Sequence, residues 1–285
     1  MNYSIEDIME RAKELTTKPE IVVRAEQMLL DPNISFKDIA KVVSMDPGLT
    51  ARAFKVANSC FFGRLSKAKT LTEAIVTIGI KGLYSLVLVH LIKEYYKTFG
   101  LQEMSFWNHS VSVSISSMIL ATEKGLGEVE DAMVSGLLHD IGKDILNSAE
   151  PETYADITRK VRCNGISYAL SEQELFGFTH AEVGFELAKR WNFPEHIQKV
   201  ILYHHNLFCL RQIEKESPAS FWLTSLVNLA DTLCIRLGMS IKTPQNGFGW
   251  GDVEAAKTLG FSEEQLTELE PVIKTRIEEE KRMFD

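Results

Sequence analysis

Apolar residues recur every three to four positions along most of this chain, which is the spacing of an amphipathic helix. Ser4 precedes the run IEDIMERAKEL, whose apolar residues fall on one helical face. Three later apolar runs open with sequences that resemble helix capping boxes, at Ser35 to Asp38, Thr70 to Glu73 and Ser262 to Gln265. Pro194 stands where a first-turn proline belongs, ahead of EHIQKVILYHH. The pattern therefore predicts helices along the whole chain.

One segment taken alone favours a strand. Val111, Val113 and Ile115 alternate with serines, which is a period of two. The flanking residues SFWNHS and MILATEKG continue at helical spacing, and the sequence offers no other good strand to pair with it. We therefore expect a helix here, with serines that let neighbouring helices approach closely, and an all-α fold for the chain.

Two loose stretches divide the predicted helices. One helix ends at YYKTFG, near residue 100, and TPQNGFGWG, residues 243–251, is rich in glycine and turn-forming residues. We expect an N-terminal helical subdomain over residues 1–100, a helical core that holds most of the histidines over residues 101–240, and a C-terminal helical tail over residues 241–285. The EEEKR run in the tail indicates a solvated helix face.

Composition narrows the class of protein. The 285 residues are 45% hydrophobic and 25% charged, which is typical of a soluble globular protein. A formal net charge of −8 disfavours direct nucleic-acid binding, because such binding depends on clustered lysines and arginines. The N-terminus lacks the basic start and apolar core of a signal peptide, and the longest apolar stretch, residues 83–92, is too short to cross a bilayer. No membrane partner is expected.

The four cysteines indicate a reducing compartment. They lie far apart and form no CxxC pair, so neither a disulfide framework nor a thiolate zinc site is expected. Cys60 and Cys234 have apolar neighbours and are predicted to be small core residues. Free thiols suit a reducing environment, and we expect a cytoplasmic protein.

Histidines and aspartates form an ordered set in the middle of the chain. Six of the seven histidines lie between residues 109 and 205; five of them belong to the series, and two aspartates complete it. The members are His109, His139, Asp140, His180, His204, His205 and Asp231. Imidazole nitrogens with carboxylate oxygens suit borderline divalent metals such as iron, manganese, zinc or nickel. A single histidine on an apolar helix is more often a core residue, so the prediction of a metal site rests on the ordered set.

The most specific motif is GLLHDIGK, residues 136–143. Its apolar residues are expected to bury one helical face. His139 and Asp140 would point about 100° apart around that helix and would meet one ion only over the groove between them. Lys143, four residues after His139, would lie on the same side, where it can contact an anion bound at the metal.

The order H…HD…D, carried by His109, His139–Asp140 and Asp231, resembles that of the HD superfamily of metal-dependent phosphohydrolases. His180 and the pair His204–His205 resemble the additional ligands of its HD-GYP branch, which builds multi-metal sites and hydrolyses cyclic dinucleotides. The resemblance implies that the residues of the H…HD…D series would hold one ion. His180, His204 and His205 would help to hold a second ion.

The chain departs from the HD-GYP pattern in two places. The run YHHNLFCL has neither the glutamate of an HHE motif nor a following GYP motif. Ser105 stands where that branch has a glutamate, four residues before the first histidine. Both departures argue against a trinuclear site and against ordinary cyclic-di-GMP hydrolysis.

Longer motifs resemble the HDOD family, the HD-related output domains, over about residues 15–240. The segment DPGLTARAFKVANSCFFG, residues 46–63, is similar to the N-terminal signature of that family. AIVTIGIKGL, FWNHSVSVS, GLLHDIGK, FTHAEVGFELAKRWNFPEHI and YHH follow in the same order. The resemblance implies the helical HDOD fold, with an HD-like core and an N-terminal subdomain. The residues of segment 46–63 themselves predict an apolar helical stripe that packs as the core of this subdomain, formed by Leu49, Ala53, Val56 and Ala57. Asn58 and Ser59 would tie the end of that helix to a loop.

The resemblance supports a bacterial signalling output module as the first interpretation, because HDOD proteins are generally regulatory. Such a module would bind other signalling proteins or a nucleotide-type ligand, with one or two metal ions as structural or sensory elements. The alternative is a metal-dependent phosphohydrolase of a nucleotide or cyclic dinucleotide, in which Asp140 bridges two ions and Lys143 stabilises charge on the phosphoryl oxygens. A third interpretation is oxygen or redox sensing at a di-iron site.

Overall fold

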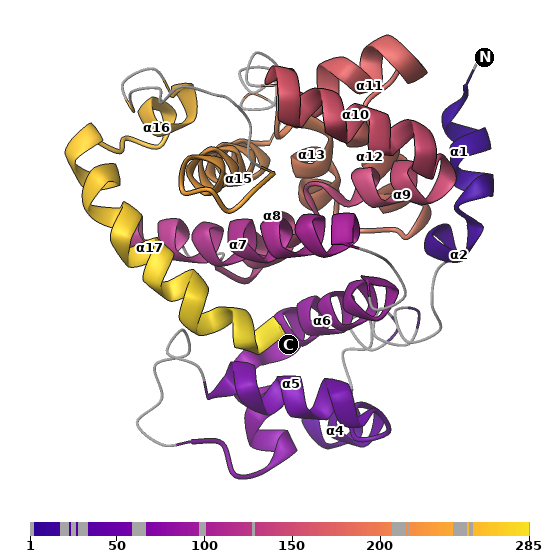
Figure 1. The fold of residues 1–285 in the computed structure, drawn as a ribbon. Coiled ribbons are helices and arrows are strands. Elements are labelled where there is room, and N and C mark those ends of the chain that lie inside the picture. Colours follow the sequence, from indigo (N-terminus) through magenta and orange to yellow (C-terminus); the bar gives the residue numbers. More distant parts are fainter. Residues whose placement is uncertain are drawn as a thin grey trace. The chain divides into compact units, whose positions relative to one another are not determined.

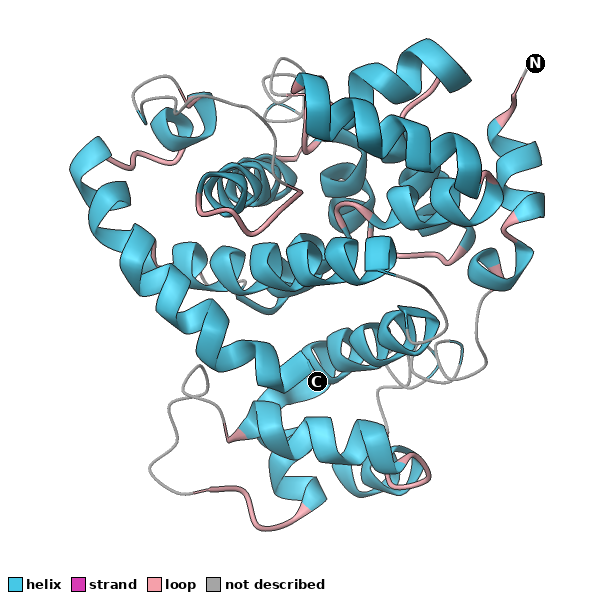
Figure 2. Cartoon of the chain, in the orientation of Figure 1, coloured by secondary structure: helices cyan, strands magenta, loops and turns pink. Residues whose placement is uncertain are grey.

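The computed structural model describes residues 3–17, 23, 27, 34–58, 67–96, 101–126, 129–206, 215, 217–241, 250 and 253–284. Every regular element in these ranges is a helix, and none is a strand (Figure 2). The all-α prediction is confirmed, and the alternating segment around Val113 lies inside α7 (Leu101–Glu123). In the same ranges, no helix is both long enough and apolar enough to span a membrane.

The chain forms two compact units, one of residues 1–17 and 99–279 and one of residues 18–98 and 280–285. The predicted divisions at residues 100 and 240 stay a prediction. The larger unit contains α1 (Ile5–Arg11), α2 (Lys13–Thr16), α7, α8 (Val129–Leu138), α9 (Ile141–Ala149), α10 (Pro151–Asn164), α11 (Tyr168–Phe176), α12 (His180–Arg190), α13 (Glu195–Tyr203), α15 (Pro218–Arg236), α16 (Glu254–Thr258) and most of α17 (Glu263–Phe284) (Figure 1). Trp191 attaches the N-terminal helices to this unit, because its Nε1 donates to the Thr16 carbonyl at 3.1 Å.

The smaller unit is built from α4 (Phe36–Val43), α5 (Pro47–Ala57) and α6 (Leu71–Tyr96). Their apolar faces share one core, which includes the predicted stripe of Leu49, Ala53, Val56 and Ala57. The prediction that Asn58 ties the end of α5 to a loop is confirmed, because its side chain accepts a hydrogen bond from Ala68 N at 2.7 Å. Ser59 and Cys60 lie outside the described residues.

Local sequence signals fix where several helices begin. In the predicted boxes Ser35 to Asp38, Thr70 to Glu73 and Ser262 to Gln265, the first side chain accepts from the backbone N–H three residues later at 3.1 or 3.2 Å. Pro194 differs by one position from its expected place. Its ψ of 141° is extended, so it caps α13, and the helix starts at the next residue. The side chains of Ser35, Thr70 and Ser262 satisfy backbone donors that a helix start leaves unpaired.

Small residues bring α7, α8 and α15 close together, as the serine pattern predicted. Ser114 Oγ donates to the Met133 carbonyl at 2.8 Å, and a Cβ added at Gly136 would lie 2.9 Å from Ser114 Cα. Ser116 Oγ lies 3.2 Å from the Sγ of Cys234, which is buried as predicted. These helices position several of the candidate ligands, so their close approach holds the candidate site together.

Candidate metal centre

The larger unit gathers all the candidate ligands in one place. They come from five separate stretches of the chain: His109 from α7, His139 and Asp140 from the turn after α8, His180 from the start of α12, His204 and His205 from the turn after α13, and Asp231 from α15. They form two groups, and within each group the ligand atoms lie within 4.8 Å of one another. Side chains that are far apart in the sequence therefore lie together in space. Their binding of a metal ion stays a prediction.

The GLLHDIGK motif does not form one continuous helix. α8 ends at Leu138, His139 and Asp140 form a turn, and α9 starts at Ile141. The expectation that His139 and Asp140 point about 100° apart on a helix is therefore wrong. The turn instead brings the two side chains together, with Asp140 Oδ2 3.3 Å from His139 Nε2. Lys143 follows on α9, and its Nζ lies 2.6 Å from Asp140 Oδ2.

Gly142 sets how closely α9 approaches α12. A Cβ at this position would overlap the carbonyl oxygen of His180 and would lie 2.8 Å from the backbone nitrogen of Gly184. The turn at Asp140 directs α9 onto α12, and glycine permits the contact between the two backbones. Close packing of these helices places Asp140 beside His180.

Replacing Gly142 by alanine should destabilise the larger unit, because the added carbon meets backbone atoms that no rotamer change can move. We expect a loss of about 2–3 kcal/mol in unfolding free energy and a fall of roughly 5–10 °C in melting temperature. Thermal unfolding of the purified chain checks this. The variant K160A, at an exposed position of α10, should stay within about 0.5 kcal/mol of the parent. Equal melting of G142A and the parent would show that the contact is not tight.

The first group consists of His109, His139 and Asp231, all of which are buried. His109 Nε2 lies 3.0 Å from Asp231 Oδ1, and the His109 and His139 rings are 5.4 Å apart between centroids. Two imidazoles and one carboxylate, drawn from three separate segments, therefore face a shared point.

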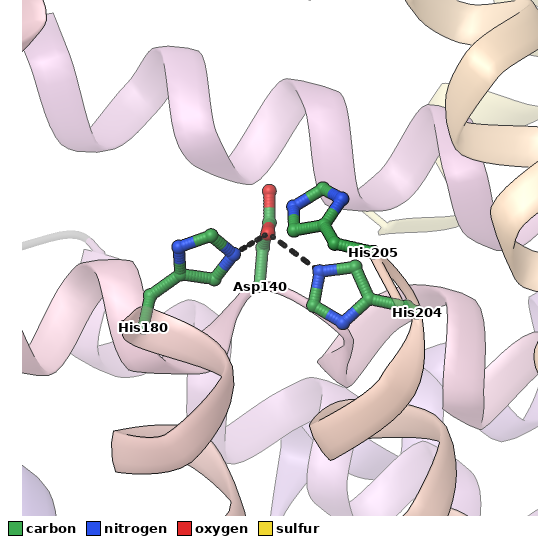
Figure 3. Close-up of side chains that lie close together, drawn as sticks. All are labelled: Asp140, His180, His204 and His205. Carbon is green, nitrogen blue, oxygen red and sulfur yellow. Dashed lines mark ion pairs between the residues drawn. The ribbon is translucent and has the colours of Figure 1, made fainter. Parts of the chain in front are cut away.

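The second group consists of Asp140, His180, His204 and His205 (Figure 3). Asp140 Oδ1 lies 3.3 Å from His180 Nε2 and 3.5 Å from His204 Nε2. His180 and His204 have no exposed surface, whereas His205 is exposed. The His205 ring centroid is 5.1 Å from that of His180, so this exposed imidazole still faces the group.

Asp140 is shared between the two groups. Its Oδ2 faces the first group, at 3.3 Å from His139 Nε2 and 3.7 Å from His109 Nε2. Its Oδ1 faces the second group, as the distances to His180 and His204 show. A carboxylate that offers one oxygen to each of two neighbouring sites has the arrangement of a ligand that bridges two ions.

Hydrogen bonds at the outer nitrogens orient the imidazoles inward. His139 Nδ1 lies 2.8 Å from the Gly136 carbonyl, and His204 Nδ1 lies 2.8 Å from the Ile201 carbonyl. A carbonyl can only accept, so Nδ1 carries the proton, and the ring in its neutral form presents the lone pair of Nε2 to the centre. The Nδ1 of His180 has a carboxylate partner in the same position.

The inward atoms are buried without hydrogen-bond partners in the part of the chain that the structure describes. They are the Nε2 atoms of His139, His180 and His204 and the Oδ1 atom of Asp140. Buried polar atoms in native proteins are almost always paired, so a cluster of unpaired ones calls for an occupant. Nitrogen and carboxylate donors that converge in this way fit a borderline divalent metal ion.

The electrostatics of the pocket favour the metal-binding forms of His204 and Asp140, whereas His139 and His180, although buried, have pKa values raised by the carboxylates of Asp140 and Glu172. Burial lowers the pKa of His204 to about 4, so its Nε2 is unprotonated at neutral pH. Burial opposes the charge of Asp140, but His139 and Lys143 hold the pKa of its carboxyl well below the usual value. Metal ligands must be deprotonated, and here the histidine is neutral and the aspartate ionised.

Glu172 is a side chain of the candidate site that the sequence did not predict. It is fully buried on α11, and its Oε2 lies 2.6 Å from His180 Nδ1 and accepts from His180 N at 2.8 Å. Tyr154 Oη donates to its other oxygen at 2.6 Å. One sequence signal was available: Tyr168, Glu172 and Phe176 recur every four residues, which places the glutamate on the helical face that Phe176 buries.

Replacing Glu172 by glutamine should weaken the metal affinity of the second group by about tenfold or more, with little effect on the first. The charge that fixes the tautomer and orientation of His180 would be lost. Manganese titration of the purified chain measures both affinities. E174Q changes an exposed glutamate of the same helix and should leave both affinities unchanged. Equal affinities in E172Q and the parent would mean that Glu172 only fills space.

A cavity of about 410 Å³ opens beside the two groups. His109, Lys143, His205 and Asp231 are among its lining residues. Lys143 Nζ also lies 4.7 Å from the centroid of the Tyr168 ring, which lines the same cavity. A small molecule in this cavity would therefore meet both candidate ligands and the ammonium group that the sequence singled out.

An all-helical unit around a buried histidine–aspartate cluster is the arrangement that the HD-like motifs implied. The chain belongs to the HDOD domain family, whose sequence pattern matches residues 15–207. Asp231 lies beyond the matched residues, so its place in the cluster comes from the structure. The predicted family and its helical fold are both confirmed.

Known proteins resemble this chain over different lengths. An uncharacterized protein of Treponema pallidum is 26% identical over 201 residues, which are 70% of this chain and 39% of that protein. Ribonuclease Y of Thermotoga petrophila is 32% identical over 133 residues, which are 47% of this chain and 20% of the enzyme. The chain thus spans about two fifths and one fifth of the lengths of these relatives. A crystal structure of an HDOD domain protein with unknown function from Geobacter sulfurreducens superposes with a TM-score of 0.72 at 25% identity, over 97% of this chain and 99% of that one.

Proposed function

We propose that this protein is a signalling-type HDOD module whose buried pocket holds two divalent metal ions, one on each side of Asp140. The observation that carries the proposal is the convergence of buried Nε2 and carboxylate atoms without hydrogen-bond partners among the described residues. Each unpaired buried polar atom costs about 1–3 kcal/mol of stability. Bound metal ions would remove that penalty and would explain why so many polar side chains are buried together.

The two groups divide the ligands between the ions, with Asp140 common to both. The first ion would be held by His109, His139 and Asp231, and the second by His180, His204 and His205. Divalent ions lower the pKa of coordinated water and polarise phosphoryl oxygens when they are bound. Lys143 donates to Asp140 Oδ2, which keeps that carboxylate oriented between the groups, and its ammonium lines the cavity where an anion would enter.

A regulatory role is supported by the resemblance to the HDOD output modules and by the absence of two glutamates that the HD-GYP branch has beside its histidine ligands. Asn206 follows His205 where the HD-GYP branch has a glutamate, and Ser105 replaces the other glutamate of that branch. Neither side chain is a carboxylate, so the ligand set suits two ions better than three. We infer that the partners are other signalling proteins of a reducing cytoplasm, in keeping with Cys163 and Cys234, which form no disulfide among the described residues.

Metal content and hydrolysis, measured on the same preparation, test the proposal. We expect about two ions per chain and no turnover of phosphate monoesters or diesters. A chain that binds no metal after reconstitution with manganese, iron and zinc in turn would overturn it. If the metal-loaded chain hydrolysed these esters and the double variant H139A/D140A did not, the protein would instead be assigned as a metal-dependent phosphohydrolase.

The second candidate is a metal-dependent phosphohydrolase, and two observations favour it. The cavity gives small molecules access to the ligand groups and to Lys143, and Ribonuclease Y is 32% identical over 133 residues. The net charge of −8 disfavours a long polyanion such as RNA as the substrate. Hydrolysis of bis(4-nitrophenyl) phosphate by the loaded chain is the assay. If H139A/D140A lost metal but kept the full rate, this candidate would be eliminated.

A further inference from the structure

We infer that the cavity beside the metal centre is a binding site for a small organic phosphate, whose apolar group rests on Ile166 and Leu170 at the cavity wall. The inference rests on the proposed metal centre and adds the chemical class of its ligand. It follows from how the wall is built, from how polarity changes along the cavity, and from the size and charge of the cavity.

Helix caps hold the apolar wall in place. α10 ends at Asn164 and is capped by Gly165, whose φ of 69° lies in the left-handed region that glycine readily adopts. Ser167 then caps α11, because its Oγ accepts from Leu170 N at 3.2 Å. Ile166 therefore sits on a connection of defined geometry between two helix ends, and Leu170 sits in the first turn of the next helix. Such a wall is shaped before any ligand arrives.

Polarity changes from one part of the cavity to another. His109, Lys143 and Asp231 provide charged and polar groups at the metal centre. The apolar lining residues come from the end of α10, the segment that leads into α11 with the first turn of that helix, and the end of α15 and beyond: Val161, Ile166, Ala169, Leu170, Ile235 and Ile241. This arrangement fits a ligand with two chemically different parts. A phosphoryl group would face the centre, and an apolar or planar organic group would lie on the wall.

Exposure of the wall supports this assignment. Leu170 is 61% exposed and Ile166 is 36% exposed, although both are large apolar side chains. Two such side chains four residues apart, at a cavity that also holds charged groups, leave apolar surface in water that a ligand can cover. Covering this apolar surface with the organic part of a ligand is therefore more favourable than leaving it in contact with water.

Size and charge select the class of ligand further. A volume of about 410 Å³ falls in the range of about 300–1,000 Å³ that is typical of small-molecule sites, and it is far larger than inorganic phosphate requires. Asp140 and Asp231 place two carboxylates near one ammonium, so an anion would be repelled without metal. The site should therefore take a single organic phosphate, and only when the centre is loaded.

Calorimetric titration of the full chain with two non-hydrolysable phosphonates tests the inference. The probes are methylphosphonate and benzylphosphonate, which share the anionic group and differ in the apolar one. On the manganese-loaded chain we expect benzylphosphonate to bind at least about tenfold more tightly. In the double variant I166S/L170S this preference should fall to about twofold or less, while the affinity for methylphosphonate stays the same.

L175S is the matched control, because Leu175 is 41% exposed on the same helix but does not line the cavity. It should keep the full preference for benzylphosphonate. Equal affinities of the two probes for the loaded parent chain would overturn the organic-phosphate site and leave the metal centre standing, as would binding of neither probe. A chain that takes up no metal would overturn the centre and this inference together. Benzylphosphonate binding that survives chelation of the metals would also contradict it.

Discussion

Replacing Asp140 by asparagine should weaken metal binding at both positions together, by at least about 100-fold at each. Its two oxygens face different groups, Oδ2 toward His139 and Oδ1 toward His180. Asparagine keeps the shape but loses the negative charge, and its NH2 group cannot act as a ligand. Lys143 would also lose its ion-pair partner and would add an uncompensated positive charge at the centre. Manganese titration followed by spectroscopy measures the two affinities.

Single-group variants supply the contrast for this result. H109A removes a ligand of the first group and should lower the affinity for one ion only, and H204A should do the same for the other ion. E152Q, at an exposed glutamate of α10, controls for a general loss of negative charge and should bind both ions normally. The sharing of Asp140 would be contradicted if D140N lost just one ion, or if it bound both like the parent chain.

Removing the metals should lower the melting temperature of the chain by roughly 10–20 °C. An ion present at about 100 times its dissociation constant stabilises the folded state by about 2.7 kcal/mol, so two ions contribute about 5 kcal/mol. The physical source is the buried set of Nε2 and carboxylate atoms, which have no hydrogen-bond partners among the described residues. Thermal unfolding with and without EDTA, followed by addition of metal in excess, measures the shift and its reversal.

The same thermal series contains its own control. D140N should melt at one temperature whether or not EDTA is present, because it has little metal to lose. K160A, on the exposed side of α10, should show the full shift of the parent chain. If EDTA left the parent's melting temperature unchanged in a preparation of known metal content, the ions would not stabilise the fold, and the unpaired atoms would need another explanation.

Much of the fold followed from sequence because local signals and helical spacing agreed. The segment around Val113 was the exception in local pattern, and its place inside α7 was decided by flanking residues at helical spacing. Alternation alone cannot distinguish a strand from a helix that is buried on all sides. Ser112, Ser114 and Ser116 are fully buried in α7, so the polar half of the pattern did not mark a solvent face.

The ligand set followed from the resemblance, but its geometry did not. Spacing could not reveal that the chain turns at Asp140 and brings Gly142 against the His180 carbonyl, because that contact joins residues some forty positions apart. Glu172 was not predicted as part of the site for a similar reason. Nothing in SEQELF distinguishes this buried glutamate from the exposed Glu174 except its place on the helix, and its partner His180 lies on the next helix. The approach of Gly142 to His180 and the pairing of Glu172 with His180 are both tertiary contacts, which local sequence does not encode.

Anomalous X-ray diffraction from crystals of the manganese-loaded chain is the most direct test of a two-ion centre. Two peaks are predicted, one between Asp140 Oδ2 and the first group and one between Asp140 Oδ1 and the second. Each should lie within coordination distance of the Nε2 atoms that face it. A pocket without a peak, or a single peak bound away from Asp140, would contradict the account.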